Sequence, residues 1–290
     1  MGLKSLVPWR AKLAAKIALS RLPVPYRFWR ALSCFDLGPM EKPEYAYAVF
    51  REHFDRAAPP APEDGFVCLE LGPGNTLFTA LIGRAFGAKK TYLVDEGAFA
   101  DGARRPYFRM AEYLQRAGLV PPPLAGCATL DEILVRSGAE YHTGGLASLA
   151  AIPAGSVHFL FSHAVLEHVR RADFPATMRE MKRVLHPDGV ASHRVDFTDH
   201  LNGRLDSLRF SMRRWESRLF AASGFYTNRL RYSEIVEACA KAGMIVETPK
   251  VERWPELPTA REKLAAPFRD LSESDLQVFA CDLLLRPAVR

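Results

Sequence analysis

The chain has 290 residues and a net charge of +6, and its 48% hydrophobic and 25% charged residues are those of an ordinary globular protein. No run approaches the roughly 18 apolar residues of a membrane span. Five scattered cysteines with no C-x-x-C spacing argue against a zinc ribbon or a disulfide scaffold and fit a reducing cytoplasm.

The positive charge is concentrated at the beginning of the chain. Residues 1–35 carry seven Lys and Arg side chains and no acid, so the remaining residues carry a net charge of −1. Leu6, Trp9, Leu13 and Ile17 have helical spacing, which predicts a basic amphipathic helix. This arm either lies on the anionic inner face of a membrane or packs on the body of the protein or on a second copy of the chain. Charge interrupts its apolar residues too often for a signal peptide, and the near-neutral body disfavours nucleic acid as a partner.

Helical and strand patterns alternate along the rest of the chain. After a first helix at 45–54 and a proline-rich linker, strands are predicted at 66–70, 92–94, 140–143, 157–161, 190–197, 244–251 and 276–285. Further helices are predicted to start at Thr76 and to cover 107–117, 129–136, 174–185 and 233–242, with His186 to Gly189 as a turn and Ser233 as a helix cap. This alternation indicates a mostly parallel sheet covered by helices on both faces. We expect an N-terminal helical extension at 1–62 and one α/β domain at 63–290, with an insertion at 198–228.

A glycine turn follows the first strand, within FVCLELGPGNT. Strand, glycine turn and helix form a nucleotide cleft at the carboxyl end of a parallel strand. The third glycine of the dinucleotide fingerprint would fall at Leu77, and Glu70 would repel a pyrophosphate but suits an ammonium group. Asp95, about 20 residues beyond the turn, is placed to hold ribose hydroxyls. The turn therefore predicts a cationic nucleoside without phosphate, and S-adenosylmethionine has these groups.

Four motifs in this order resemble class I S-adenosylmethionine-dependent methyltransferases: Glu70-x-Gly72-x-Gly74, Asp95, SVHFLFSHAVLEHV at 156–169 and RVLHPDGV at 183–190. The resemblance implies a Rossmann-like fold with a seven-stranded, mostly parallel sheet and S-adenosylmethionine as cofactor. Residues 192–234 resemble methyltransferases associated with bacterial polysaccharide and glycan biosynthesis. The cofactor contacts that the resemblance implies are Glu70, Gly72, Pro73, Gly74, Asn75, Asp95, Glu96, Ser162 and His163. His158 replaces an acid common in the fourth strand, and no acid for the adenine amino group is evident at 143–146.

A hydroxyl acceptor needs a general base, because its own pKa is far above neutrality. The preferred candidate is His200, oriented by Asp199 or Asp196; the alternative is that these side chains only fix their loop. His163 and His193 are further candidates, although the odd separation of His193 and Asp196 places them on opposite faces of a strand. No metal site is assigned, neither at Glu167-His168 nor at this His and Asp cluster.

The insertion at 198–228 is interpreted as a substrate lid. Aromatic faces pack on sugar rings and arginines bind phosphate or carboxylate groups; the alternative is an amphipathic helix with a solvated basic face. The predicted substrate contacts are His168, Arg209, Trp215, Tyr226, Asn228 and Arg229.

Together these features predict a cytoplasmic methyltransferase that methylates a hydroxyl of a sugar or glycan precursor. If the arm lies on a membrane, the protein is peripheral to the inner face of that membrane. The alternatives are a methyltransferase of another small molecule or of nucleic acid, an NAD(P)-dependent oxidoreductase, and a non-catalytic module that binds S-adenosylmethionine.

Overall fold

The computed structural model describes residues 39–200, 202–223 and 225–288. The predicted basic arm at 1–35 lies outside these residues. Among the helices of the described ranges, none is long and apolar enough to cross a bilayer.

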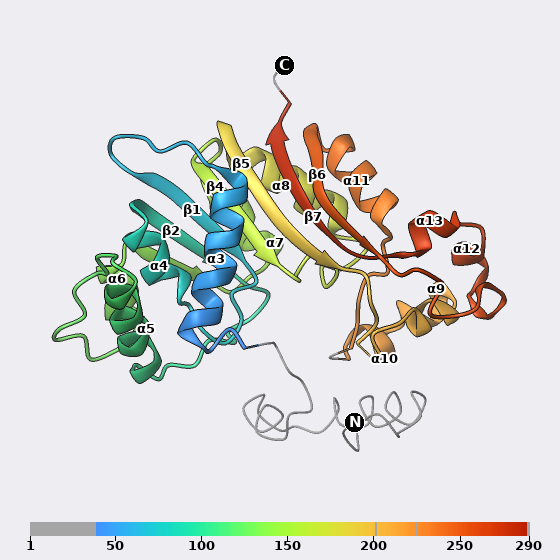
Figure 1. Ribbon diagram of the computed structural model, residues 1–290, viewed down its shortest axis with the longest axis horizontal. Helices are drawn as coiled ribbons and strands as arrows, with labels where there is room; N and C mark the ends of the chain where they lie inside the picture. The colour runs from blue at the N-terminus through green and yellow to red at the C-terminus, as the bar shows by residue number, and fades with distance from the viewer. Residues whose placement is uncertain (1–38, 201, 224, 289–290) are drawn as a thin grey trace.

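A seven-stranded sheet in the order β3-β2-β1-β4-β5-β7-β6 forms the centre of the molecule (Figure 1). All neighbouring strands are parallel except β7, which runs antiparallel to both β5 and β6. The strands are β1 (Phe66–Leu71), β2 (Ala88–Val94), β3 (Ala139–His142), β4 (Val157–His163), β5 (Leu185–Asp196), β6 (Met244–Arg253) and β7 (Val278–Pro287). The chain order reverses between β1 and β4, so a ligand crevice is expected at the carboxyl ends of these two strands.

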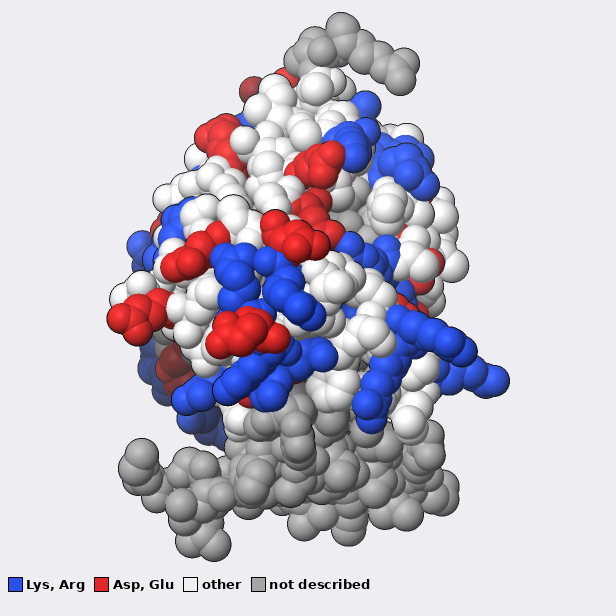
Figure 2. Space-filling view, turned by 90° about the vertical axis from the view of Figure 1, so that its right-hand side faces the viewer, with Lys and Arg blue, Asp and Glu red and all other residues white. Residues whose placement is uncertain are grey.

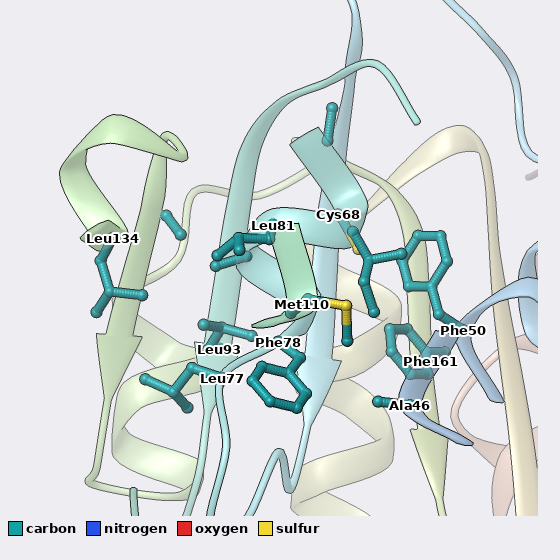
Figure 3. Packing of buried hydrophobic residues seen from close by; sticks show 14 of the residues in the cluster. Ala46, Phe50, Cys68, Leu77, Phe78, Leu81, Leu93, Met110, Leu134 and Phe161 are labelled. Carbon is teal, nitrogen blue, oxygen red and sulfur yellow. The ribbon is translucent and has the colours of Figure 1, made fainter. Parts of the chain in front are cut away.

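Helices cover both faces of the sheet. They are α3 (Pro43–Ala57), α4 (Thr79–Ala85), α5 (Arg105–Arg116), α6 (Leu130–Arg136), α7 (Leu146–Ala151), α8 (Phe174–Val184) and α11 (Tyr232–Lys241). Apolar residues of α3, α4, α5 and α6 pack in one core, and those of α7, α8 and α11 pack in a second core on the opposite face. Phe50 of α3 and Met110 of α5 meet Phe161 of β4 and Cys68 of β1 in the first core (Figure 3).

The helix α3 lies within the predicted extension at 1–62, yet its side chains belong to the core of the sheet. Ala46, Phe50 and Ala57 are at most 2% exposed, and Phe50 contacts Phe159 and Phe161 edge-on. The boundary of the folded unit therefore precedes α3 and does not follow it.

Two predicted boundaries are wrong. His186 to Gly189 does not separate helix from strand, because β5 already begins at Leu185 and this segment bulges where the register with β4 shifts. Gly189 is needed there, since a Cβ would lie 2.6 Å from the Val157 carbonyl oxygen. The cap of α11 is Arg231, whose N–H donates to the Glu234 carboxylate (3.0 Å), while Ser233 donates to Asp275 (3.0 Å).

The insertion at 198–228 folds into short helical turns, so the interpretation as one amphipathic helix is also wrong. It contains η2 (Asp206–Arg209), α9 (Met212–Trp215) and α10 (Arg218–Ala221). Leu205 and Leu208 pack with residues of the connection between β6 and β7, which contains η3 (Arg261–Lys263), α12 (Ala266–Arg269) and α13 (Glu273–Leu276). Figure 1 shows both segments beyond the same end of the sheet.

Candidate active site

The glycine turn follows β1 as predicted. Gly72 and Gly74 both have φ of +70°, a conformation that side chains other than glycine rarely adopt. A Cβ on Gly72 would lie 2.5 Å from a methyl carbon of Val165, in the loop after β4. Gly72 thus lets the loops after β1 and β4 pack together at the crevice, a role that the sequence alone does not reveal.

Glu70 ends at this crevice with a buried carboxyl group. Burial, and then the nearby Asp95 carboxylate, raise the pKa of Glu70 to about 8, although a hydrogen bond with the Thr79 side chain opposes the shift. A carboxyl with this pKa is mostly protonated at neutral pH, and an adjacent cation would favour its ionised form. The predicted contact of Glu70 with an ammonium group is compatible with this buried carboxyl and stays a prediction.

Asp95 lies across the turn from β2. Its two carboxylate oxygens accept hydrogen bonds from the N–H groups of Gly74 (3.0 Å) and Glu96 (2.9 Å). The side-chain oxygen of Asn75 is buried in the same turn and accepts no hydrogen bond in the structure. An acceptor without a partner beside two carboxyl groups fits a ligand that offers N–H and O–H donors. This donor set fits S-adenosylmethionine, with its ammonium group and its ribose hydroxyls; the individual contacts remain predictions.

Glu96 contacts the loop after β3. A Cβ on Gly145 would lie 2.1 Å from a carboxylate oxygen of Glu96 and would displace this flexible side chain. The φ of +52° at Gly145 also favours glycine. The Tyr141 hydroxyl donates to the carbonyl of Gly97 (3.0 Å) and joins β3 to the loop after β2. The Glu96 carboxylate thus lies beside the loop at 143–146, which itself lacks the acid expected for the adenine amino group.

His193 is not a general base. Its ring is fully buried, and its Nδ1 lies 2.7 Å from the Ser162 hydroxyl. Burial lowers the pKa of His193 to about 3, so the ring stays neutral. Ser162, a predicted cofactor contact, is itself fully buried and uses its side chain in this pair.

His163, at the end of β4, has a partner that the sequence did not suggest. Its Nδ1 lies 3.2 Å from Nε2 of His53, and the other nitrogen of His53 lies 2.8 Å from the Ser192 hydroxyl. Desolvation lowers the pKa of both histidines. His53 comes from α3, more than a hundred residues before His163, and no local pattern marks it.

His200 pairs with His168, a partner that the sequence did not suggest. The two rings stack with centroids 4.9 Å apart, and their Nε2 atoms are 3.1 Å apart. Nδ1 of His168 lies 3.0 Å from the Tyr226 carbonyl oxygen, to which it must donate its proton. The Nε2 of neutral His168 is therefore an acceptor, and the proton between the rings belongs to His200. Desolvation and the neighbouring His200 lower the pKa of His168, so this ring is neutral at pH 7.

The two aspartates near this pair hold backbone groups. The Asp199 carboxylate accepts hydrogen bonds from the N–H groups of Asn202 (2.7 Å) and Asp206 (2.6 Å), and Asp196 accepts one from Thr198 (2.8 Å). These contacts fix the loop after β5, as the alternative interpretation proposed. Asp196 also helps burial to raise the pKa of Glu167 well above its ordinary value.

The predicted sugar-binding aromatic residues pack against one another. Trp215 is 1% exposed, its Nε1 donates to the Thr227 carbonyl (2.7 Å), and its ring packs with Phe220, Phe225 and Tyr226. A buried ring cannot offer its face to a sugar, so the prediction for Trp215 is wrong. The Tyr226 ring is also mostly buried, although its hydroxyl donates to Glu216 (2.9 Å).

Arg209, Asn228 and Arg229 are likewise used within the protein. Arg209 pairs with Asp206 (3.2 Å), and the Asn228 amide donates to the carbonyls of Leu166 and Val169. Arg229 is buried and donates to the carbonyls of Ser207 (3.1 Å) and Phe210 (2.7 Å). Asn228 thus holds the end of the insertion to the loop after β4, and Arg229 holds parts of the insertion together. Both side chains are buried, which corrects their prediction as substrate contacts. Arg209 is partly exposed beside Asp206, and its role stays a prediction.

A family comparison matches the same part of the chain. Residues 123–192, which include β3, β4 and α8, match the model described as "Methyltransferase domain". The chain is an S-adenosylmethionine-dependent methyltransferase. No curated protein sequence matches it.

The solved structures that resemble the chain do so only distantly. The YcgJ protein from Bacillus subtilis is 14% identical with a TM-score of 0.45, over 85% of this chain and 100% of that one. An S-adenosylmethionine-dependent methyltransferase from Mesorhizobium loti is 18% identical with a TM-score of 0.41, over 78% and 93% of the two chains. Similarity at this level does not indicate an acceptor.

In this methyltransferase, the predicted cofactor residues and the histidine pair lie at the same edge of the sheet, because β1, β2, β4 and β5 are parallel. Glu70, Asn75 and Asp95 lie at the carboxyl ends of β1 and β2, whereas His168 and His200 follow β4 and β5. When bound, S-adenosylmethionine supplies an activated methyl group, so the protein must align an acceptor and remove its proton.

Proposed function

We propose that the methyltransferase transfers the methyl group to a hydroxyl of a sugar or glycan precursor, and that the His168–His200 pair accepts the hydroxyl proton. The observation that carries this proposal is the contact between His200 and His168, whose pKa is lowered so that its ring is neutral, in the loops that follow β5 and β4. A neutral imidazole can take a proton from an alcohol, whereas a thiol or amine acceptor has less need of such a base.

The two histidines have different roles in this proposal. The Tyr226 carbonyl fixes the tautomer of His168, which then accepts a hydrogen bond from His200 and orients it. His168 thus has the orienting role that the sequence assigned to Asp199. His163, supported by His53, is the second candidate base.

Sugar specificity is supported by the resemblance of residues 192–234 to glycan methyltransferases and by the charged side chains around Tyr226. Acidic side chains interrupt the basic ones on the face that carries α12 and α13, as Figure 2 shows, so this face lacks the continuous basic surface typical of nucleic-acid binding. In this proposal the insertion covers the crevice as a lid. The protein acts in the cytoplasm.

Cofactor binding is the first test. Calorimetry with S-adenosylhomocysteine should show saturable binding to the full chain, and binding of a nicotinamide cofactor instead would support the oxidoreductase alternative. Transfer of label from methyl-labelled cofactor into fractionated cell envelope should then identify the acceptor. A labelled product that survives base treatment, which cleaves esters, and carries the methyl group on nitrogen or sulfur would contradict a hydroxyl acceptor.

The base is tested by His200→Ala and His168→Phe. Both changes should lower kcat by roughly 10²-fold or more, while the Kd for S-adenosylhomocysteine changes less than threefold. Because a base must be unprotonated to accept the hydroxyl proton, and His168 must be neutral to accept the hydrogen bond from His200, the rate should fall as the pH decreases. His142→Ala, which alters a histidine at the end of β3, is the matched control. Near-normal turnover of both variants would transfer the role to His163.

A further inference from the structure

A hollow of about 540 Å³ lies between the loop after β4 and the insertion. Arg170, Arg171, Ala172 and Asp173 line it from the β4–α8 loop, and Glu216 lines it from the end of α9. Tyr226 connects the hollow to the histidine pair, because it contacts residues of both. The Tyr226 carbonyl holds His168, while its ring and hydroxyl contact Arg170 and Glu216.

One cation in this hollow is held without an ionic partner. The guanidinium of Arg170 lies 4.9 Å from the centre of the Tyr226 ring. In the part of the chain that the structure describes, no ion pair joins Arg170 to a carboxylate, whereas its neighbour Arg171 pairs with Glu234. Stacking on an aromatic ring restricts a guanidinium while leaving its N–H groups able to bind an anion.

The two carboxylates of the hollow suit a different part of a ligand. Glu216 accepts a hydrogen bond from the Tyr226 hydroxyl and, like Asp173, is exposed at the rim. Carboxylate oxygens accept hydrogen bonds from hydroxyl groups and repel anions. One arginine that is not in an ion pair among the described residues, together with two carboxylates, therefore matches a molecule with a single anionic group and several hydroxyls.

We propose that this hollow binds a glycosyl phosphate, with the phosphate on Arg170 and sugar hydroxyls on Asp173 and Glu216. This inference rests on the proposed function and names its substrate class as a phosphorylated sugar. It also explains how acceptor binding occurs although Arg209 and Arg229, the predicted anion ligands, are engaged within the protein.

The test is calorimetric titration of the full chain with glucose 1-phosphate, with glucose and with inorganic phosphate. Each titration is made with and without S-adenosylhomocysteine. Glucose 1-phosphate should bind more tightly than either fragment. Arg170→Gln should weaken this binding at least tenfold, and Arg170→Lys should restore part of it, because lysine keeps the charge but loses the bidentate geometry. Arg179→Gln, an exposed arginine on α8, is the matched control and should bind like the wild type.

The outcomes separate the two proposals. Unchanged binding in Arg170→Gln, or equal binding of inorganic phosphate and glucose 1-phosphate, would overturn the glycosyl phosphate site even if S-adenosylhomocysteine binds. Binding of glucose 1-phosphate that depends on Arg170, in a chain that fails to bind S-adenosylhomocysteine, would support the hollow and overturn the proposed methyl transfer.

Discussion

Individual histidines at the sheet edge differ because their surroundings differ. His193 is fully buried against Ser162, with a pKa of about 3, while His168 accepts a hydrogen bond from His200 at the protein surface. From residue type and sequence position alone, His193 was a candidate base and His168 a candidate substrate contact. Only the packing around each ring shows which one can exchange a proton with a ligand.

Glu70 gives a prediction for stability against pH. Its pKa is about 8 in the folded chain and about 4.5 in an unfolded one, so the unfolded chain loses this proton first as the pH rises. The free energy of unfolding should therefore fall between pH 4.5 and 8. Glu70→Gln should remove most of this slope and be more stable than the wild type at pH 8, by more than ~1 kcal/mol. Urea denaturation at several pH values measures both effects.

Glu63→Gln, a change in the exposed loop before β1, is the control for this experiment and should keep the wild-type slope. Glu70→Gln should also weaken S-adenosylhomocysteine binding, because the amide cannot neutralise an ammonium group. An unchanged pH slope in Glu70→Gln would show that the folded chain ionises this group at its ordinary pKa.

At the scale of elements, the strands and the cofactor turn were predictable, and the insertion was not. Apolar runs that end in Asp95 or precede Gly72 identify parallel strands because burial on both faces demands such runs. Trp215 and Arg229 follow no such rule, since an aromatic residue beside an arginine fits a ligand site and a small core equally well. The partners of these residues lie far away in the sequence, as His53 does from His163, and only the fold brings them together.

The insertion should lose its structure locally when its core is removed. Trp215→Ala deletes a buried ring and its hydrogen bond to Thr227, which should cost about 3 kcal/mol or more within this segment. Amide hydrogen exchange should accelerate across 206–221, while the Kd for S-adenosylhomocysteine changes less than threefold. Leu219→Ala, at a 38% exposed position, should have little effect on exchange. Equal protection in both variants would contradict the role of Trp215.

At the scale of the whole molecule, one carboxylate joins the beginning of the domain to its end. Asp282 of β7 is 2% exposed and pairs with Arg56 of α3 (2.9 Å) and Arg194 of β5 (3.3 Å). Arg194 also pairs with Glu252 of β6. Elements from both ends of the described chain therefore meet at one buried charge.

Asp282→Asn should destabilise the protein by about 3 kcal/mol, because it leaves two partly buried guanidinium groups beside a neutral side chain. Thermal and urea unfolding measure this loss. Glu247→Gln disrupts an exposed pair with Arg286 on the neighbouring strand and should cost less than ~1 kcal/mol. Similar stability of the two variants would mean that the Asp282 cluster contributes no more than a surface pair.

The position of β7 has a consequence for how the chain folds during translation. β7 follows β6 in the sequence but lies between β5 and β6 in the sheet. During translation β6 is therefore synthesised before β7, the strand that joins it to the rest of the sheet. Until residues 278–287 emerge, β5 is an unprotected edge that other chains can pair with. A nascent chain paused in this region should be the species that most needs a chaperone.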